Sequence, residues 1–304
     1  MTQFDRGLGV TKWLRDVFSG GDELLLALLT QLGDVWFLLT VAGTFYVVSA
    51  GRGTQTHRRR GAFVLALPLV YLVLVTAMKG AFELPRPPDA GVAPPIPWLP
   101  SLVVPVYENT ATATGYGFPS GHAIGTTLVW GGLGLVADRW SRRLRAGVVA
   151  SVVTLVCLSR LALGVHYLVD VVAGVAIGVT TLLALYYLSD LGREPDRVFF
   201  VAVVGGVVAV VTSWTFDSVL VLGGIVGVWL GWYAFVDSSL TLSVSRRAVA
   251  LSAAVFVGTL LVYGALYLWN LPVPVMFGAS VLAAALVVGV PDIGERVARR
   301  LDAT

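Results

Sequence analysis

Long apolar stretches alternate with short polar segments along the whole chain. A helix that crosses a bilayer needs about 20 mostly apolar residues. By that criterion the pattern predicts membrane-spanning helices at about residues 24–50, 62–82, 121–137, 147–164, 168–188, 198–214, 218–235, 248–269 and 274–290. We therefore expect an all-α fold, in the form of a polytopic membrane helix bundle.

The first of these stretches is interrupted by Gly33 and Asp34. Two interpretations stay open for the part before the break. Either the whole stretch crosses the membrane, or Leu24–Leu32 lies along the interface and the span begins near Val35.

Composition supports a membrane protein, because 57% of the residues are hydrophobic and only 13% are charged. A soluble domain carries about a quarter charged residues. No basic patch is interleaved with aromatic residues, so we expect no nucleic-acid partner. Cys157 is the one cysteine and lies in an apolar run, which excludes a disulfide framework and a thiolate metal site.

Basic residues predict the orientation, since cytoplasmic loops are enriched in Lys and Arg. One alternate set of connecting segments holds 15 of the 21 basic residues. The segment Glu83–Phe118 then lies on the non-cytoplasmic side. Its many prolines predict an extended or turn-rich cap without a helix, with Trp98 and Tyr107 at the bilayer interface.

Three basic residues, Lys79, Arg86 and Arg160, lie on the side where basic residues are scarce. Each alone is explained by a side chain that reaches the lipid headgroups. Together they indicate a shared anion, because Arg offers planar paired donors to phosphate and Lys a point charge.

The run Pro119-Ser120-Gly121-His122 opens the predicted span at 121–137. Proline suits a first helical turn, serine caps free N–H groups, and such an N-terminus binds anions. The alternatives are plain helix capping by Ser120 and a polar surface role for His122.

A second histidine, His166, precedes Asp170 by four residues near the start of the span at 168–188. On one helix this spacing puts both side chains on the same face. The carboxylate then fixes the imidazole tautomer and leaves the other ring nitrogen as a nucleophile. The alternative is a structural His–Asp pair that closes the turn at Gly164.

Three cations, a helix N-terminus and two histidines match the needs of phosphoryl transfer. The cations neutralise phosphate oxygens, one imidazole attacks in line, and the other protonates the leaving group. We expect no metal, because Lys79, Arg86 and Arg160 would repel a cation.

These motifs resemble the signature of the type 2 phosphatidic acid phosphatase (PAP2) superfamily, in its membrane-integral lipid phosphatase branch. Lys79 to Arg86-Pro87 fits Lys-x6-Arg-Pro, Pro119 to His122 fits Pro-Ser-Gly-His, and Ser159-Arg160 to His166 and Asp170 fits Ser-Arg-x5-His-x3-Asp. The order of the motifs and the membrane context agree as well.

The resemblance implies roles for these residues. His166 is expected to be the nucleophile that forms a phosphohistidine, Asp170 its orienting partner, and His122 the general acid. The expected phosphate-binding residues are Lys79, Arg86, Ser120, Gly121 and Arg160. The family needs no metal or organic cofactor.

The resemblance also implies a division of the chain. Residues 1–188 would form the catalytic core of five to six helices, and residues 189–304 a C-terminal extension of about four transmembrane helices with unknown role. The expected protein is a multi-pass cell-membrane phosphatase that hydrolyses a lipid phosphate monoester or a polyprenyl or lipid diphosphate, with its active site on the non-cytoplasmic side.

Two other functions remain open at this stage. A phosphotransferase would pass the phosphoryl or headgroup to an alcohol. A non-catalytic protein would bind an anion without cleaving it. In each case the expected partners are the bilayer and a membrane lipid.

Overall fold

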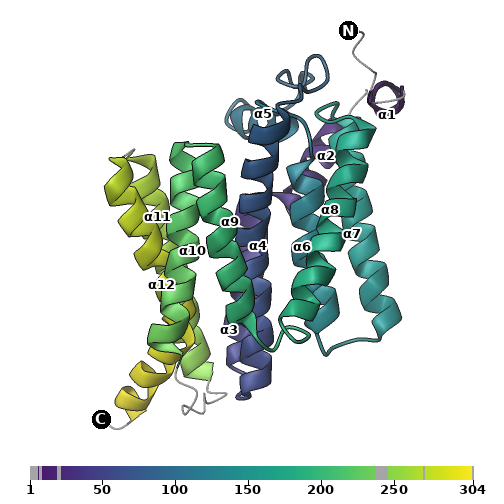
Figure 1. Cartoon of the computed structure of the whole chain (residues 1–304). Helices are drawn as coiled ribbons and strands as arrows, with labels where there is room; N and C mark the ends of the chain where they lie inside the picture. Colours follow the sequence, from purple (N-terminus) through teal and green to yellow (C-terminus); the bar gives the residue numbers. More distant parts are fainter. Residues whose placement is uncertain (1–5, 7–8, 19–21, 237–245, 270, 303–304) are drawn as a thin grey trace. The chain divides into compact units, whose positions relative to one another are not determined.

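The computed structural model describes residues 6, 9–18, 22–236, 246–269 and 271–302 (Figure 1). All regular structure in these residues is helical, which confirms the predicted all-α class. The helices are α1 (Val10–Val17), α2 (Glu23–Thr30), the short 3-10 helix η1 (Gln31–Gly33), α3 (Val35–Ala50), α4 (Gln55–Phe82), α5 (Val104–Ala111), α6 (Gly121–Val136), α7 (Arg142–Ala162), α8 (Leu168–Leu188), α9 (Pro195–Thr212), α10 (Phe216–Phe235), α11 (Arg246–Leu268) and α12 (Val273–Asp302).

Within the described residues, seven helices are long and apolar enough to cross a membrane: α4 and α7 to α12. The pair formed by residues 23–33 and α3 passes the same test as one span that bends by 47°. Helix α6 has 16 residues and is therefore about 24 Å long, shorter than a usual span. The expectation of a multi-pass membrane protein is confirmed.

The bend in the first span falls at Gly33 and Asp34, as the sequence predicts. Gly33 is needed there, because a Cβ atom would lie 2.4 Å from Oγ1 of Thr126 and 2.8 Å from a methyl group of Val156. The indole N–H of Trp130 in α6 donates a hydrogen bond of 3.0 Å to the Leu32 carbonyl. These contacts fix the break against α6 and α7.

The chain divides into two compact units. The first contains residues 1–38 and 78–182, and the second contains residues 39–77 and 183–304. In the first unit α7 packs against α1, α2 and α6, while Gly174 and Gly178 let α8 approach α6 closely. The segment 39–77 groups with the C-terminal helices, although it precedes the predicted catalytic motifs in sequence.

In the second unit α12 packs against α10 and α11 (Figure 1). Gly227 and Gly231 lie directly against the backbone of α12, where a Cβ atom would come within 3 Å of Val281 and Ala285. In the described part of the chain, four helices, α9 to α12, follow the predicted catalytic motifs.

Helix α4 begins at Gln55, whereas the predicted span began at about residue 62, so Arg58 to Arg60 lie in the first turns of the helix. Arg58 is 1% exposed and forms an ion pair with Asp292 of α12. A buried charge requires such a partner, which explains why this arginine is inside the protein.

The proline-rich cap at 83–118 contains a helix, α5, which corrects the expectation of a helix-free segment. Pro105 lies in its first turn, where the missing N–H costs nothing. Tyr107 is buried and donates a hydrogen bond of 2.9 Å to the Pro94 carbonyl, so it belongs to the cap interior and not to the bilayer interface. Trp98 is exposed.

Candidate active site

Lys79 lies in the last turn of α4, and the chain then leads through an extended segment to Arg86. This segment packs against Gly117, whose N–H donates a hydrogen bond of 2.8 Å to the Leu84 carbonyl. A Cβ atom at Gly117 would lie 3.0 Å from the Pro85 oxygen, so a larger residue would have to displace this segment. The contact holds Arg86 next to the residues that precede α6.

The Arg86 guanidinium joins two loops. Its Nε donates to the Thr114 carbonyl at 3.0 Å, and its Nη1 donates to the Val165 carbonyl at 2.9 Å. The same Nη1 lies 3.0 Å from Nε2 of His166. Burial lowers the pKa of Arg86 to about 10, with Asp170 acting in the opposite direction, so this side chain stays cationic at neutral pH.

Ser120 caps α6, and its Oγ accepts a hydrogen bond of 3.5 Å from the Ala123 N–H. The capping prediction is confirmed, but Pro119 precedes the cap and does not enter the first turn. The Ser120 N–H donates a hydrogen bond of 2.9 Å to the Asp170 carbonyl oxygen. This bond ties the N-terminus of α6, with Gly121 and His122, to the start of α8.

His166 lies in the turn before α8, which begins at Leu168, so it does not share a helix face with Asp170 as the spacing suggested. The chain turns at Gly164, which has a φ of 71°. The Asp170 carboxylate accepts a hydrogen bond of 2.9 Å from the Tyr167 N–H through Oδ2. That oxygen lies 3.5 Å from Nδ1 of His166, so the predicted pair forms by a different route.

The surroundings of His166 determine its protonation. Burial, and after it the charges of Arg86, Arg160, Lys79 and His122, hold the pKa of His166 well below its usual range. A guanidinium only donates hydrogen bonds. The contact with Arg86 therefore requires an unprotonated Nε2, and the proton of the neutral ring then lies on Nδ1, which faces Asp170.

All eight predicted residues belong to the first compact unit. Ser120, Arg160, His166 and Asp170 are almost completely buried. Arg160, in the last turn of α7, donates a hydrogen bond of 3.1 Å to Oγ1 of Thr30 in α2. Lys79, Arg160 and His122 act on His166 electrostatically, whereas Arg86 and Asp170 lie directly against its ring.

Four polar residues near the site were missed by the sequence reasoning: Arg6, Thr11, Thr30 and Asp34. Arg6 forms an ion pair of 2.9 Å with Asp170. Oδ2 of Asp34 lies 3.8 Å from Nε2 of His122. The break at Gly33 and Asp34 was a visible signal for Thr30 and Asp34. No sequence pattern connects Arg6 or Thr11 with residues about 160 positions away.

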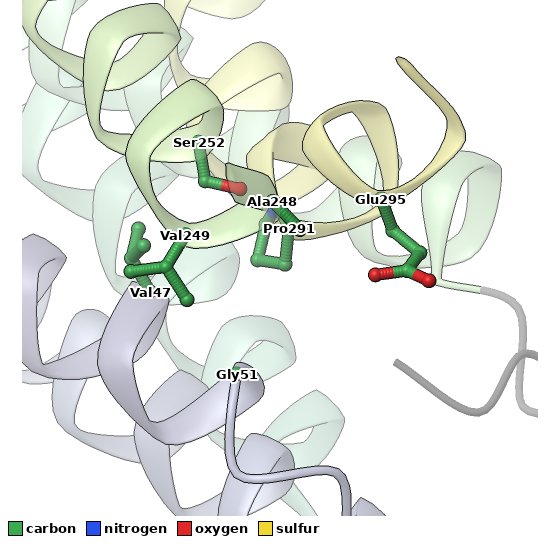
Figure 2. Close-up of a pocket in the computed structure, with 7 residues that line it drawn as sticks. All are labelled: Val47, Gly51, Ala248, Val249, Ser252, Pro291 and Glu295. Atoms are coloured by element: carbon green, nitrogen blue, oxygen red, sulfur yellow. The ribbon is translucent and has the colours of Figure 1, made fainter. Parts of the chain in front are cut away.

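A pocket in the second unit contains none of the predicted residues (Figure 2). It is lined mainly by apolar side chains, together with Ser252 and Glu295. Glu295 accepts a hydrogen bond of 2.7 Å from Nε of Arg299, so its charge is partly matched. The chemistry-bearing residues thus gather in the first unit and not around this pocket.

Comparison with known proteins agrees with this arrangement. Residues 61–193 match the family model described as the PAP2 superfamily. The resemblance seen in the motifs is therefore confirmed for this part of the chain, and it supports phosphatase-type activity in a membrane-spanning protein. No curated protein and no solved structure shows significant similarity to the chain.

Proposed function

We propose that this protein hydrolyses a lipid phosphate monoester, or a lipid or polyprenyl diphosphate, through a phosphohistidine at His166. The observation that carries the proposal is the environment of this one ring. Its Nδ1 lies 3.5 Å from Asp170 and its Nε2 lies 3.0 Å from Arg86, beside the N-terminus of α6.

The first step transfers the phosphoryl group to the protein. A phosphate bound by Lys79, Arg86 and Arg160 replaces the imidazole as the partner of the Arg86 guanidinium. Nε2 of His166 then attacks phosphorus in line, and the bond from phosphorus to the leaving oxygen breaks. His122 donates a proton to that oxygen, so the product leaves as an alcohol or as a phosphate.

The second step restores the protein. Water gives a proton to His122 and attacks phosphorus, the bond from phosphorus to Nε2 breaks, and inorganic phosphate leaves. Asp170 faces Nδ1 in both steps and stabilises the positive charge that develops on the ring. The Ser120 hydroxyl and the Gly121 N–H donate hydrogen bonds that stabilise the charge on the phosphate oxygens.

A lipid substrate follows from the membrane setting, because an amphiphile can present its headgroup at a site near the helix ends. We also propose that this site faces the non-cytoplasmic side. The basis is the charge bias, with 15 of the 21 basic residues in the opposite set of connecting segments. Candidate substrates are phosphatidic acid, phosphatidylglycerol phosphate and polyprenyl diphosphate.

Phosphate release from the purified wild type, measured against this panel of lipids, tests the proposal. We expect inhibition by vanadate, which adopts the five-coordinate geometry of the transition state, and little effect of EDTA. His166→Ala should lower turnover by on the order of 10⁴-fold or more while the protein stays folded. A fully active His166→Ala variant together with strong inhibition by EDTA would contradict the mechanism.

A phosphotransferase would use the same first step, so the product distribution must separate the two activities. In the presence of a competing alcohol, a hydrolase releases inorganic phosphate, whereas a transferase forms the phosphorylated alcohol. An anion-binding protein without activity would retain vanadate but release no phosphate from any lipid in the panel.

A further inference from the structure

The N-terminal helix α1 packs against the turn that carries His166. Leu14 belongs to a buried apolar cluster with Leu161, Leu163 and Val165. On the same helix, Oγ1 of Thr11 donates a hydrogen bond of 3.1 Å to the backbone carbonyl of His166. Residues before α2 therefore contact the backbone of the proposed nucleophile, although they lie outside the region 61–193 that matches the family model.

Arg6 makes the most extensive of these contacts. Its Nη1 lies 2.9 Å from Oδ1 of Asp170, and its guanidinium lies 4.7 Å from the centre of the Tyr167 ring. Its Nη2 donates to the carbonyl of Pro85, the residue before Arg86. The backbone carbonyl of Arg6 accepts a hydrogen bond of 3.3 Å from the Val169 N–H. One side chain thus connects the loop of Arg86 with the turn of His166 and Asp170.

The two oxygens of Asp170 have separate partners. Oδ1 pairs with Arg6, whereas Oδ2 accepts from the Tyr167 N–H and faces Nδ1 of His166. The Asp170 side chain is 0% exposed, so a rotation away from His166 would have to find a partner inside the protein. The bond to Arg6 opposes such a rotation and matches the carboxylate charge. Lys79 and Arg86 then keep their charge for a phosphate.

We propose that Arg6 is a positioning residue of this site, which holds the Asp170 carboxylate in the orientation that aligns His166 for attack. The inference rests on the proposed phosphatase function. It adds a residue from the N-terminal segment to a site whose other members all lie between Lys79 and Asp170.

Steady-state kinetics of the full-length wild type, Arg6→Gln, Arg6→Lys and Lys12→Gln test the inference on the lipid that the wild type hydrolyses best. Lys12 is an exposed basic residue on α1 and serves as the matched control. We expect Arg6→Gln to lower kcat by about 10- to 100-fold with KM changed less than about threefold, the range found for groups that orient metal-binding histidines. Arg6→Lys should recover about half of this loss on a logarithmic scale, and Lys12→Gln should match the wild type.

The pH profile separates positioning from a purely structural role. Without Arg6, the negative charge of Asp170 favours the protonated ring of His166, so the acid limb of kcat/KM should move to higher pH in Arg6→Gln. It should stay in place in Arg6→Lys, which keeps the charge. The other groups that act on the ring, Lys79, Arg86, His122 and Arg160, are the same in all variants.

Each outcome decides between the two proposals. A wild type that releases no phosphate from any lipid overturns both the phosphatase and the role of Arg6. An active wild type with an equally active, folded Arg6→Gln overturns only the role of Arg6. If Arg6→Gln does not fold, Arg6→Lys decides: a reduced kcat supports positioning, and full activity assigns Arg6 to the fold alone.

Discussion

Each compact unit contains an arginine–aspartate pair whose carboxylate is buried, and the two pairs have different surroundings. In the first unit, Arg6 and Asp170 are joined across 164 positions of the sequence, and Asp170 also faces the ring of His166. In the second unit, Arg58 and Asp292 are joined across 234 positions. The neighbouring Tyr46 donates a hydrogen bond from its hydroxyl to the Val288 carbonyl. Among the described residues, no histidine interacts with Arg58 or Asp292.

The comparison shows that a buried ion pair is a weak sign of function by itself. Such pairs contribute little net stability, although removal of one partner is costly because it leaves a buried charge. What distinguishes the first pair is the set of groups around it: an imidazole in contact with the carboxylate, and three further cations within electrostatic range of that imidazole. This set fits a phosphate, whereas the second pair fits a structural role.

The largest expected difference between the units is in turnover. Asp170→Asn replaces an acceptor with a group that also donates, which favours the wrong tautomer of His166. We expect kcat to fall by on the order of 10⁴-fold, as in other His–Asp arrangements. Asp292→Asn should leave kcat per folded molecule unchanged. Phosphate release by the two purified variants, normalised to the folded fraction, measures this difference.

Asp292→Asn, which should keep its turnover, is nevertheless expected to lose stability. Asp292→Asn leaves the charge of Arg58 buried without its carboxylate, which costs about 3–5 kcal/mol. Thermal unfolding in detergent should show this as a lowered midpoint. The comparison fails if Asp292→Asn abolishes turnover of folded protein, or if Asp170→Asn retains it.

A smaller difference is expected for glycines in the two units. A Cβ atom at Gly174 would lie 2.8 Å from the Ser120 carbonyl oxygen and 2.9 Å from Cβ of Ala123. Gly174→Ala should therefore push α8 away from the N-terminus of α6 and displace Asp170, with a loss of about 10- to 100-fold in kcat.

The matched control is Gly224→Ala in α10, where an added Cβ meets no atom within 4 Å. It should keep full activity and stabilise its helix by about 0.5–1 kcal/mol. Equal activities for Gly174→Ala and the wild type would show that the contact between α6 and α8 tolerates displacement.

The smallest expected effect is a shift of the pH profile. In the proposed mechanism His166 attacks only as the neutral ring, and its pKa is well below the usual range, so the wild type should keep its activity at pH values below about 6.5. Arg86→Gln removes the neighbouring charge with the largest effect on the pKa of His166, and Lys79→Gln removes one with a smaller effect. The acid limb of kcat/KM should therefore move to higher pH, further for Arg86→Gln. Identical acid limbs in all three proteins would contradict the electrostatic role of these cations.

Much of the fold could be predicted because membrane helices are encoded by long local apolar runs. The break at Gly33 and Asp34, the cap at Ser120 and the turn at Gly164 are also local signals, and all three agree with the structure. Helix α5 was not predicted because it lies in a proline-rich segment. Proline occurs both in turns and in the first turn of a helix, so composition alone did not separate the two.

The site was predicted less completely because part of it depends on contacts between distant segments. Lys79, Arg86, His122 and Arg160 were found as exceptions to the charge bias or as parts of motifs. Arg6 was not predicted as part of the site, because a contact across 164 positions has no periodic signal. His166 was placed on the helix by its spacing, whereas the helix begins two residues later.

The contact between Arg86 and Nε2 of His166 has a consequence for the idle protein. While no phosphate is bound, the lone pair that would react is engaged by a guanidinium at 3.0 Å. An electrophile without an anionic group offers Arg86 no replacement partner, so Nε2 of His166 keeps its contact with the guanidinium. In the proposed mechanism, a ligand that offers its own oxygens to Arg86 releases the ring, so the residue proposed to bind the phosphate also engages the proposed nucleophile until that ligand arrives.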